Sequence, residues 1–259
     1  MNWPGVRESF VLNAKRALYA GRGEPYEFAG RTLRFIPGSR PVRRKYRHSP
    51  NWINRDDVLE MLWMEENVGE GSTAIDVGAH WGIYTIMLAV KCGPRGTVVA
   101  FEPDPYAREV LARNVNLNRI KAPRVESFAC SDSDCEAVLF SRGGQANSSL
   151  APSVAQRGCA VEEIHVQTTT LDHYVAERSL HPHVVKIDAE GAEIRILRGA
   201  RKLLKSDARV LCELHPYAWP EFGNSLEELE SLVSSASRKI RYLDPGRSRN
   251  TYGMTELVR

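Results

Sequence analysis

The chain has 259 residues, of which 42% are hydrophobic and 26% are charged, a composition typical of a folded globular protein. Its formal net charge of +3 is too small to indicate nucleic-acid binding by itself. The most apolar run, residues 83–90, is far shorter than the roughly 20 residues that cross a bilayer, so we expect no membrane span.

The cysteines and the first residues bear on the cellular compartment. The five cysteines form no C-x-x-C pair, and the N-terminal residues lack the apolar core of a secretion signal. An odd number of cysteines without such a signal is typical of reduced thiols. We therefore expect a cytoplasmic protein.

Residues 1–50 differ in character from the rest of the chain. They are rich in glycine and proline and contain a basic run at 40–48. This composition predicts an N-terminal extension, partly helical and partly β, before a domain of residues 51–259. The basic run has two interpretations, a solvated arm or a patch that steers an anionic substrate.

Helical and strand patterns then alternate along the chain. In order, the pattern predicts a helix at 56–66, a strand at 74–77, a helix at 81–90, a strand at 97–101, a helix at 105–118 and a strand at 125–129. Next come paired strands at 137–140 and 164–168 around a Gly/Ser-rich loop at 141–158, a strand at 183–187, a helix at 194–204 and a strand at 208–214. A capping box at Ser225 begins a last helix, and residues 239–243 and 253–258 form a closing antiparallel pair. This alternation predicts an α/β fold built on a doubly wound sheet.

The first strand leads into a glycine-containing turn, Asp76-Val-Gly-Ala-His-Trp-Gly82. In α/β sheets, nucleotide-like ligands bind at the tight turn between a strand and the helix that follows it. A dinucleotide fingerprint started at Gly78 would need glycines where His80 and Ile83 stand, and no phosphate-binding Gly-Lys-Ser/Thr follows. A turn with acidic side chains and no pyrophosphate cradle suits a nucleoside that carries positive charge, such as S-adenosylmethionine.

Glu102 ends the second strand and lies 102 − 78 = 24 residues after Gly78. An acidic residue about 20 residues past the first glycine accepts hydrogen bonds from ribose hydroxyls. Glu102 alone fits NAD equally well. Its combination with the failed dinucleotide spacing favours S-adenosylmethionine.

Acidic side chains stand at the carboxyl end of each predicted parallel strand, where open α/β sheets bind ligands. They are Asp76, Glu102, Asp132, Asp188 with Glu190, and Glu213, which is followed by His215. Because like charges repel, such a rim suits a cationic cofactor or a metal ion. Lys186, inside an apolar strand, is expected to be a counterion to the carboxylates, and Glu193 a helix cap.

Together, four motifs resemble the FkbM-type family of S-adenosylmethionine-dependent methyltransferases, from about residue 55 to the end. They are Asp76 to Gly82, Phe101-Glu-Pro103, Lys186-Ile-Asp-Ala-Glu-Gly-Ala-Glu193 and Glu213-Leu-His215. The resemblance implies a Rossmann-like class I fold, a mostly parallel seven-stranded doubly wound sheet with an antiparallel C-terminal strand. It also implies O-methylation of a hydroxyl on a small molecule, sugar or glycan. One departure is His80, where the family usually has Asn.

The resemblance and the strand ends assign cofactor roles to eight residues. Asp76 would orient the methionine end, the Gly78 and Ala79 backbone would approach it, and Glu102 would hold the ribose. Asp132 would accept from the adenine amino group. The turn residues His80 and Gly82, together with Asp188, complete the predicted cofactor site.

For catalysis, a substrate hydroxyl needs a base or a metal because its pKa is high. His215 is the leading general-base candidate, with Asp188 and Glu190 as rivals. A divalent ion such as Mg²⁺ on Asp188, Glu190 and Glu213 is the other route.

Two other functions stay open. One is an N-methyltransferase of the same fold, although Asp-Ala-Glu-Gly stands where amino-methylating DNA enzymes have Asn/Asp-Pro-Pro-Tyr/Phe. The other is a non-catalytic cofactor-binding scaffold. We expect no nucleic-acid partner, and the sequence leaves the oligomeric state open, a dimer included.

Overall fold

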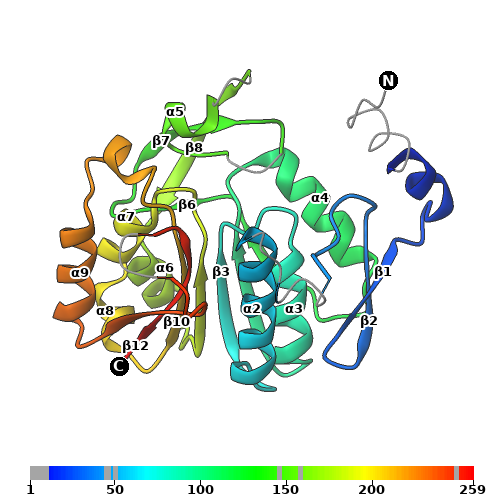
Figure 1. Cartoon of the computed structure of the whole chain (residues 1–259), viewed down its shortest axis with the longest axis horizontal. Helices are drawn as coiled ribbons and strands as arrows, with labels where there is room; N and C mark the ends of the chain where they lie inside the picture. Colours follow the sequence, from blue (N-terminus) through cyan, green and yellow to red (C-terminus); the bar gives the residue numbers. More distant parts are fainter. Residues whose placement is uncertain (1–11, 44–47, 49–51, 145–147, 157–159, 248–250) are drawn as a thin grey trace.

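The computed structural model describes residues 12–43, 48, 52–144, 148–156, 160–247 and 251–259. Within these residues, seven strands form a central sheet in the order β11-β12-β10-β9-β3-β4-β5 (Figure 1). β12 runs antiparallel to both of its neighbours, whereas the pairs from β10 to β5 are parallel. The predicted Rossmann-like α/β fold is therefore confirmed. The strands are β3 (Thr73–Val77), β4 (Thr97–Phe101), β5 (Arg124–Glu126), β9 (Val184–Ile187), β10 (Arg209–Leu214), β11 (Lys239–Tyr242) and β12 (Gly253–Val258).

Helices cover both faces of the sheet because successive strand residues point to opposite sides. On β3, Ala74 packs toward α2 and α3, whereas Ile75 and Val77 join the cluster formed with α6 to α9. Apolar side chains dominate both clusters, which explains the hydrophobic runs of the strands, and the buried pair Asp76 and Lys186 is an exception. The helices are α2 (Trp52–Asn67), α3 (Ile83–Cys92), α4 (Pro105–Asn116), α6 (Leu171–Glu177), α7 (Glu193–Arg198), α8 (Arg201–Lys205) and α9 (Leu226–Ser235).

Side-chain caps begin α4 and α9. The Asp104 carboxylate accepts from the backbone N–H groups of Tyr106 and Ala107 and begins α4, with Pro105 in its first turn. The Ser225 hydroxyl accepts from the Glu228 N–H and begins α9, as its capping box predicts.

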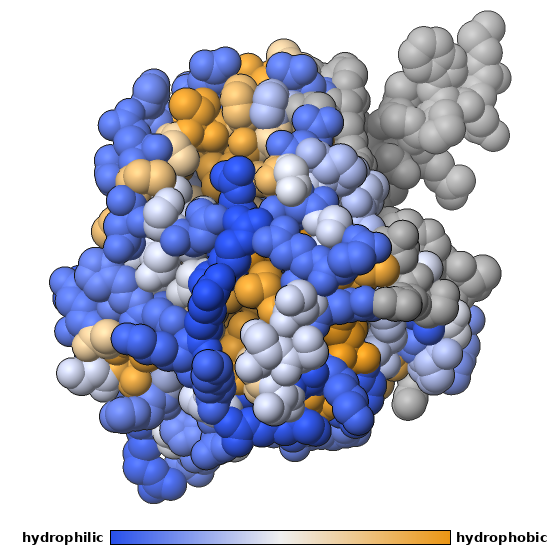
Figure 2. Space-filling view, turned by 90° about the vertical axis from the view of Figure 1, so that its left-hand side faces the viewer, coloured by the Kyte–Doolittle hydropathy of each residue, from blue (hydrophilic) through white to orange (hydrophobic). Residues whose placement is uncertain are grey.

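Figure 2 shows the side of the molecule that lies on the left of Figure 1, and hydrophilic residues cover most of it.

A small second sheet departs from the prediction. The single strand expected at 125–129 is divided into β5 in the central sheet and β6 (Ala129–Cys130), which pairs with β8 (Glu162–Thr169). β7 (Glu136–Ser141) pairs with β8 in antiparallel fashion, as predicted. The chain leaves the central sheet after Glu126, and apolar periodicity alone does not indicate such a change of sheet.

Two further predictions are corrected. The loop expected at 141–158 contains a short helix, α5 (Pro152–Gln156), although residues 145–147 and 157–158 lie outside the described residues. The helix expected at 194–204 is divided into α7 and α8 around Gly199, where an added Cβ would lie 2.2 Å from the Ser131 carbonyl oxygen. The helix is therefore interrupted at the point where the backbone of Gly199 lies close to Ser131.

The N-terminal extension is partly helical and partly β within its described residues. Residues 12–18 are helical, and β1 (Glu24–Phe28) and β2 (Arg31–Phe35) form an antiparallel hairpin beside α3 and α4 (Figure 1). Apolar hairpin side chains join the core of α2 and α3. The Asn118 side chain bonds both the N–H and the carbonyl of Arg34. In the basic run Arg40 pairs with Glu24, and residues 44–47 lie outside the described part.

The helices were also compared with the requirements for a membrane span. Within the part of the chain that the structure describes, no helix is both long enough and apolar enough to cross a bilayer.

Candidate active site

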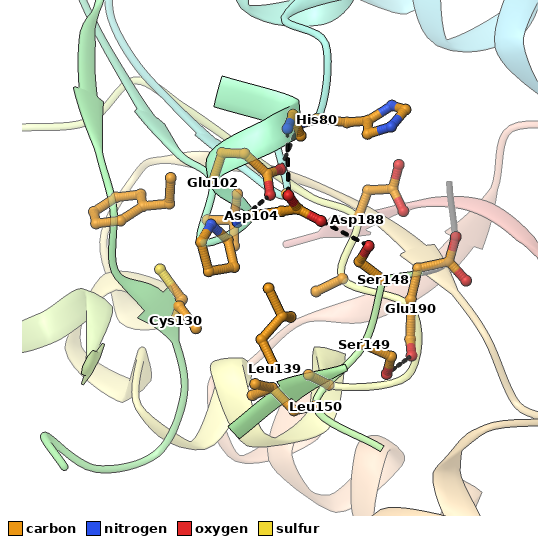
Figure 3. Close-up of a pocket in the computed structure, with 18 of the residues that line it drawn as sticks. His80, Glu102, Asp104, Cys130, Leu139, Ser148, Ser149, Leu150, Asp188 and Glu190 are labelled. Carbon is orange, nitrogen blue, oxygen red and sulfur yellow. Dashed lines mark hydrogen bonds between the residues drawn. The ribbon is translucent and has the colours of Figure 1, made fainter. Parts of the chain in front are cut away.

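A cavity opens where β3, β4 and β9 end, which is where the fold rule places a ligand (Figure 3). One part of its wall is polar and carries His80, Glu102, Asp104 and Asp188. The other part is apolar. Its side chains come from Phe128, Ala129, Cys130, Leu139, Leu150 and Ile196.

The turn after β3 has the strained backbone that its glycines predict. Gly78 has φ +77°, and a Cβ there would lie 1.7 Å from the Asp188 carbonyl oxygen, so a glycine lets the ends of β3 and β9 meet. Gly82 has the same φ, but its missing Cβ makes room for Leu111 of α4 at 2.6 Å. Gly82 lies outside the cavity wall, so its role is helix packing rather than the predicted ligand contact.

His80 lies in the left-handed region, with φ +48°. Asn is favoured there among residues with side chains, which explains why Asn is usual at this position in the family that the sequence resembles. The His80 ring stacks on Trp81, and the Gly144 carbonyl lies 3.0 Å from His80 Nε2 and accepts from Trp81 Nε1 at 2.6 Å. Burial lowers the pKa of His80, so the ring is neutral and its Nε2–H donates to Gly144.

Glu102 is buried at the cavity wall, at the end of β4. Its Oε2 accepts from the His80 N–H at 2.6 Å, and its Oε1 accepts from the Asp104 N–H at 2.9 Å. Burial raises the pKa of Glu102 to about 7. Because a carboxylate has about four lone-pair sites, two acceptor positions remain for a ligand hydroxyl pair.

Asp76 and Ala79 lie behind the cavity wall rather than in it. Asp76 is fully buried and accepts from the Thr85 hydroxyl at 2.5 Å, and burial raises its pKa. The Gly78 and Ala79 N–H groups both donate to the Phe101 carbonyl at 3.0 Å. The backbone of this turn is therefore fixed on the end of β4.

Asp132 is not among the residues that line the cavity. Its carboxylate accepts from Arg198 Nη1 at 2.7 Å, and Arg198 also binds Glu228 and Asn224. The predicted contact with adenine is therefore not supported. Asp132 follows β6, which has left the central sheet, and the ion pair holds it against α7.

Lys186 is the counterion that the sequence predicts. Its ammonium is 1% exposed and lies 3.3 Å from Asp188 Oδ2, 3.7 Å from Glu60 Oε1 and 3.8 Å from Asp76 Oδ1. It also lies over the ring of Tyr84. Asp76 and Lys186 are register partners on neighbouring parallel strands, which places their side chains on the same face of the sheet.

His215 directly follows β10 and is almost completely buried. Its Nδ1 lies 2.9 Å from Glu193 Oε1, and its Nε2 lies 3.9 Å from Asp188 Oδ1 and 3.8 Å from Glu190 Oε2. Burial alone would lower the pKa of His215, but the charges of Glu193 and its neighbours raise it to about 10. In this state the ring is a proton donor, so a general-base role requires that Nε2 first lose its proton to another group.

Glu193 is the site residue that the sequence prediction underestimated. Besides His215, it accepts from Trp219 Nε1 at 2.9 Å and from the Gly191 N–H at 2.8 Å. The role expected for it, a helix cap, accounts for the bond to Gly191 alone. Nothing in the sequence around Glu193 indicates that it contacts His215, which lies 22 residues later in the chain.

The predicted metal ligands are only partly brought together. Asp188, Glu213 and His215 each offer a ligand atom, and these atoms lie within 4.8 Å of one another. The group found in the described residues thus contains His215 in place of the predicted Glu190. Glu190 accepts from the Tyr217 hydroxyl at 3.2 Å, and Glu213 accepts from the Tyr252 hydroxyl.

Comparison with known proteins adds the family. A model of the methyltransferase FkbM domain matches residues 76–240, more than half of the chain. Methyltransferase 1 of Beauveria bassiana is 24% identical over 57% of this chain. The hexuronic acid methyltransferase AglP of Haloferax volcanii is 28% identical over 63% of it. The matches span 66% of the length of each of these two relatives.

Among solved structures, methyltransferase FkbM from Methylobacillus flagellatus is similar at 14% identity with a TM-score of 0.48, covering 81% of this chain and 55% of that one. The family assignment does not depend on that similarity. It depends on the match over residues 76–240, which begins at Asp76 and includes the turn, Glu102 and the acidic ends of β9 and β10. The chain therefore belongs to the FkbM methyltransferase domain family.

Proposed function

We propose that the protein is an S-adenosylmethionine-dependent O-methyltransferase that acts on a hydroxyl of a small molecule, sugar or glycan. Family membership supports methyl transfer. The observation that carries an adenosyl ligand is Glu102, a buried carboxylate at the wall of a cavity whose opposite wall is apolar. This arrangement suits a ribose beside an adenine. Family membership and the failed dinucleotide spacing favour S-adenosylmethionine over NAD.

The residues present fit this cofactor. The apolar side chains around Leu139 and Leu150 would enclose the adenine, and Glu102 would accept from both ribose hydroxyls. Asp76 lies behind the cavity wall with Lys186 as its counterion, and it would orient the methionine end from there. Asp132 accepts from Arg198 and does not line the cavity, so it is not part of the proposed adenine site.

The chain's own residues would mainly position the acceptor. S-adenosylmethionine supplies a methyl group already activated on its sulfonium, so alignment of the attacking oxygen contributes most to the rate. Asp188 and Glu190 line the cavity, and their side chains are 25% and 21% exposed. Either carboxylate can accept the acceptor's O–H and direct an oxygen lone pair toward the methyl group.

A sugar acceptor has some support. The relative AglP carries the name of a hexuronic acid methyltransferase. Beside His215, the rings of Tyr217 and Tyr252 lie nearly parallel, with centroids 6.4 Å apart. Flat aromatic faces with polar tips next to carboxylates suit a ring that has hydroxyls at its edge.

The test combines binding with product analysis. Calorimetry should show that the full chain binds S-adenosylhomocysteine and not NAD. Labelled S-adenosylmethionine should then methylate an alcohol from a panel of sugars, glycans, uronic acids and natural-product alcohols, with matched amines as controls. Binding of NAD alone would overturn the cofactor assignment, and label found only on nitrogen would overturn O-methylation.

Two further expectations are retained as proposals. The family match begins after the N-terminal hairpin, which supports a division into an extension of residues 1–50 and a domain of residues 51–259. The cysteine pattern supports a cytoplasmic location. Fluorescence microscopy of the tagged chain in its host would test the location.

A further inference from the structure

We propose that Asp188, Glu213 and His215 bind one divalent cation, Mn²⁺ in preference to Mg²⁺, where β9 and β10 end. The inference rests on the proposed function for its use, because the cation would hold the acceptor hydroxyl. Its donor set differs from the carboxylate set expected from the sequence, since an imidazole replaces Glu190.

The strand register brings the three ligands together. Ile187 of β9 pairs with Cys212 of β10, so the residues that follow, Asp188 and Glu213, come at the same level of the sheet. One ligand atom from each member of the group lies within 4.8 Å of the others. Ligand atoms at about 2.0–2.2 Å from a metal are at most about 4.4 Å apart, so a small inward movement would complete the site.

The imidazole is an independent observation that points to a ligand. His215 is 2% exposed, and its Nδ1 is engaged by Glu193 at 2.9 Å, which fixes the orientation of the ring. Its Nε2 points at Asp188 and Glu190 but stays 3.9 and 3.8 Å away, beyond hydrogen-bonding distance. A buried imidazole with one nitrogen held by a carboxylate and the other left without a hydrogen bond is the usual arrangement of a metal-binding histidine.

The charge balance of the surroundings favours a cation. Lys186 is surrounded by Glu60, Asp76 and Asp188. Both Glu60 Oε1 and Asp76 Oδ1 are buried and have no hydrogen-bond donor. Glu193 and Glu213 add further acidic groups next to His215. Buried charges need compensation, and a divalent cation in place of the single proton on His215 Nε2 would offset this excess more fully.

The donor types decide between metals. Mg²⁺ prefers oxygen ligands, whereas an imidazole suits later and softer divalent ions. One imidazole with two carboxylates therefore favours Mn²⁺ over Mg²⁺ and leaves positions for an acceptor oxygen. Coordination needs a neutral His215, so the cation would displace the proton from Nε2. It would also lower the pKa of a coordinated hydroxyl.

The experiment measures metal binding directly, apart from activity. The full chain is stripped with a chelator, and Mn²⁺ is titrated while the free ion is followed by electron paramagnetic resonance. We expect one bound Mn²⁺ per chain, with a Kd of about 100 µM or tighter, and weaker binding of Mg²⁺. No saturable Mn²⁺ binding up to about 1 mM in the wild-type chain overturns the proposal.

Variants identify the donors. Glu213→Gln and Asp188→Asn keep the size of the side chains and should weaken Mn²⁺ binding by about tenfold or more. Glu190→Gln removes a nearby charge but no donor of the proposed set, so it should weaken Mn²⁺ binding less than Glu213→Gln does. Loss of binding in Glu190→Gln with retention in Glu213→Gln would overturn this donor set. Thermal unfolding checks that each variant folds, and the wild-type titration decides the proposal if one does not.

Failure of this proposal and failure of the proposed function are distinguishable. S-adenosylhomocysteine is titrated into the chelator-treated chain in parallel. Binding of S-adenosylhomocysteine without any binding of Mn²⁺ leaves the methyltransferase proposal standing and removes the metal. Binding of Mn²⁺ without binding of S-adenosylhomocysteine leaves the metal site standing and removes the methyltransferase proposal.

Discussion

Replacement of Glu102 by Gln tests the cofactor site most directly. The wild-type carboxylate already accepts the N–H groups of His80 and Asp104, and we propose that it also accepts two ribose hydroxyls. The Glu102→Gln side chain has one oxygen, and its amide group turns a donor toward one of the two backbone donors. Hydrogen bonds to a charged group contribute about 1.5–3 kcal/mol, so S-adenosylhomocysteine should bind about 10- to 150-fold more weakly.

The assay is isothermal calorimetry at about pH 8, where Glu102 is ionised. The control is Glu126→Gln at the end of the neighbouring strand β5, a residue that contacts Tyr174 and Arg124 and does not line the cavity. The control should stay within about twofold of the wild type. An equally small effect in a folded Glu102→Gln chain would refute the ribose assignment.

The pH dependence of binding follows from the same residue. Burial raises the pKa of Glu102 to about 7, so the group is protonated below that pH and can no longer accept from both hydroxyls. The association constant for S-adenosylhomocysteine should therefore fall as the pH drops below about 7, by at most about tenfold per pH unit, and stay flat above it. Glu102→Gln should remove this slope. Since the folded-state pKa is raised, this group's contribution to stability is lost as the pH rises from 4.5 to about 7.

Three further changes test other parts of the site. Asn114→Ala removes a fully buried amide that bonds Ile36, Ser39 and Trp81. It should lower the free energy of unfolding, measured in urea, by about 2–4 kcal/mol, and a loss below about 1 kcal/mol would contradict this. Gly78→Ala places a Cβ 1.7 Å from the Asp188 carbonyl and should abolish binding of S-adenosylhomocysteine. The control is Gly143→Ala, which has a similar φ and open space around it and should keep the affinity within about threefold. Asp132→Asn should leave this affinity within about twofold while lowering the melting temperature, because it weakens the pair with Arg198; a large affinity loss would restore the adenine contact.

The parts of the site on strand ends could be predicted from the sequence. The strand at 97–101 was bounded correctly because an apolar run lies between Gly96 and the acidic Glu102. The parallel-strand rule then places the ends of β3, β4 and β9 at one edge, and the cavity opens there. Short-range patterns were sufficient here, because each acidic residue at this edge comes at or directly after the end of the strand that positions it.

Residues that act through the tertiary structure could not be predicted. Glu60 comes from α2 and reaches Lys186 only because α2 packs over β9, and Tyr252 reaches Glu213 from the connection between β11 and β12. Asp132 lies outside the cavity wall because the strand before it, β6, pairs with β8 instead of β5. A single sequence contains no signal for such contacts between distant elements.

The N-terminal hairpin has a practical consequence for anyone who shortens this chain. Tyr26, Phe28, Leu33 and Phe35 fill the same core as α2 and α3, and Asn114 connects this region to the carbonyl of Trp81 beside the cofactor turn. A fragment cut to the matched residues 76–240 would lack the hairpin, α2 and β12. It would expose wide apolar surfaces to water and aggregate, so a recombinant version should retain the hairpin and the last strand.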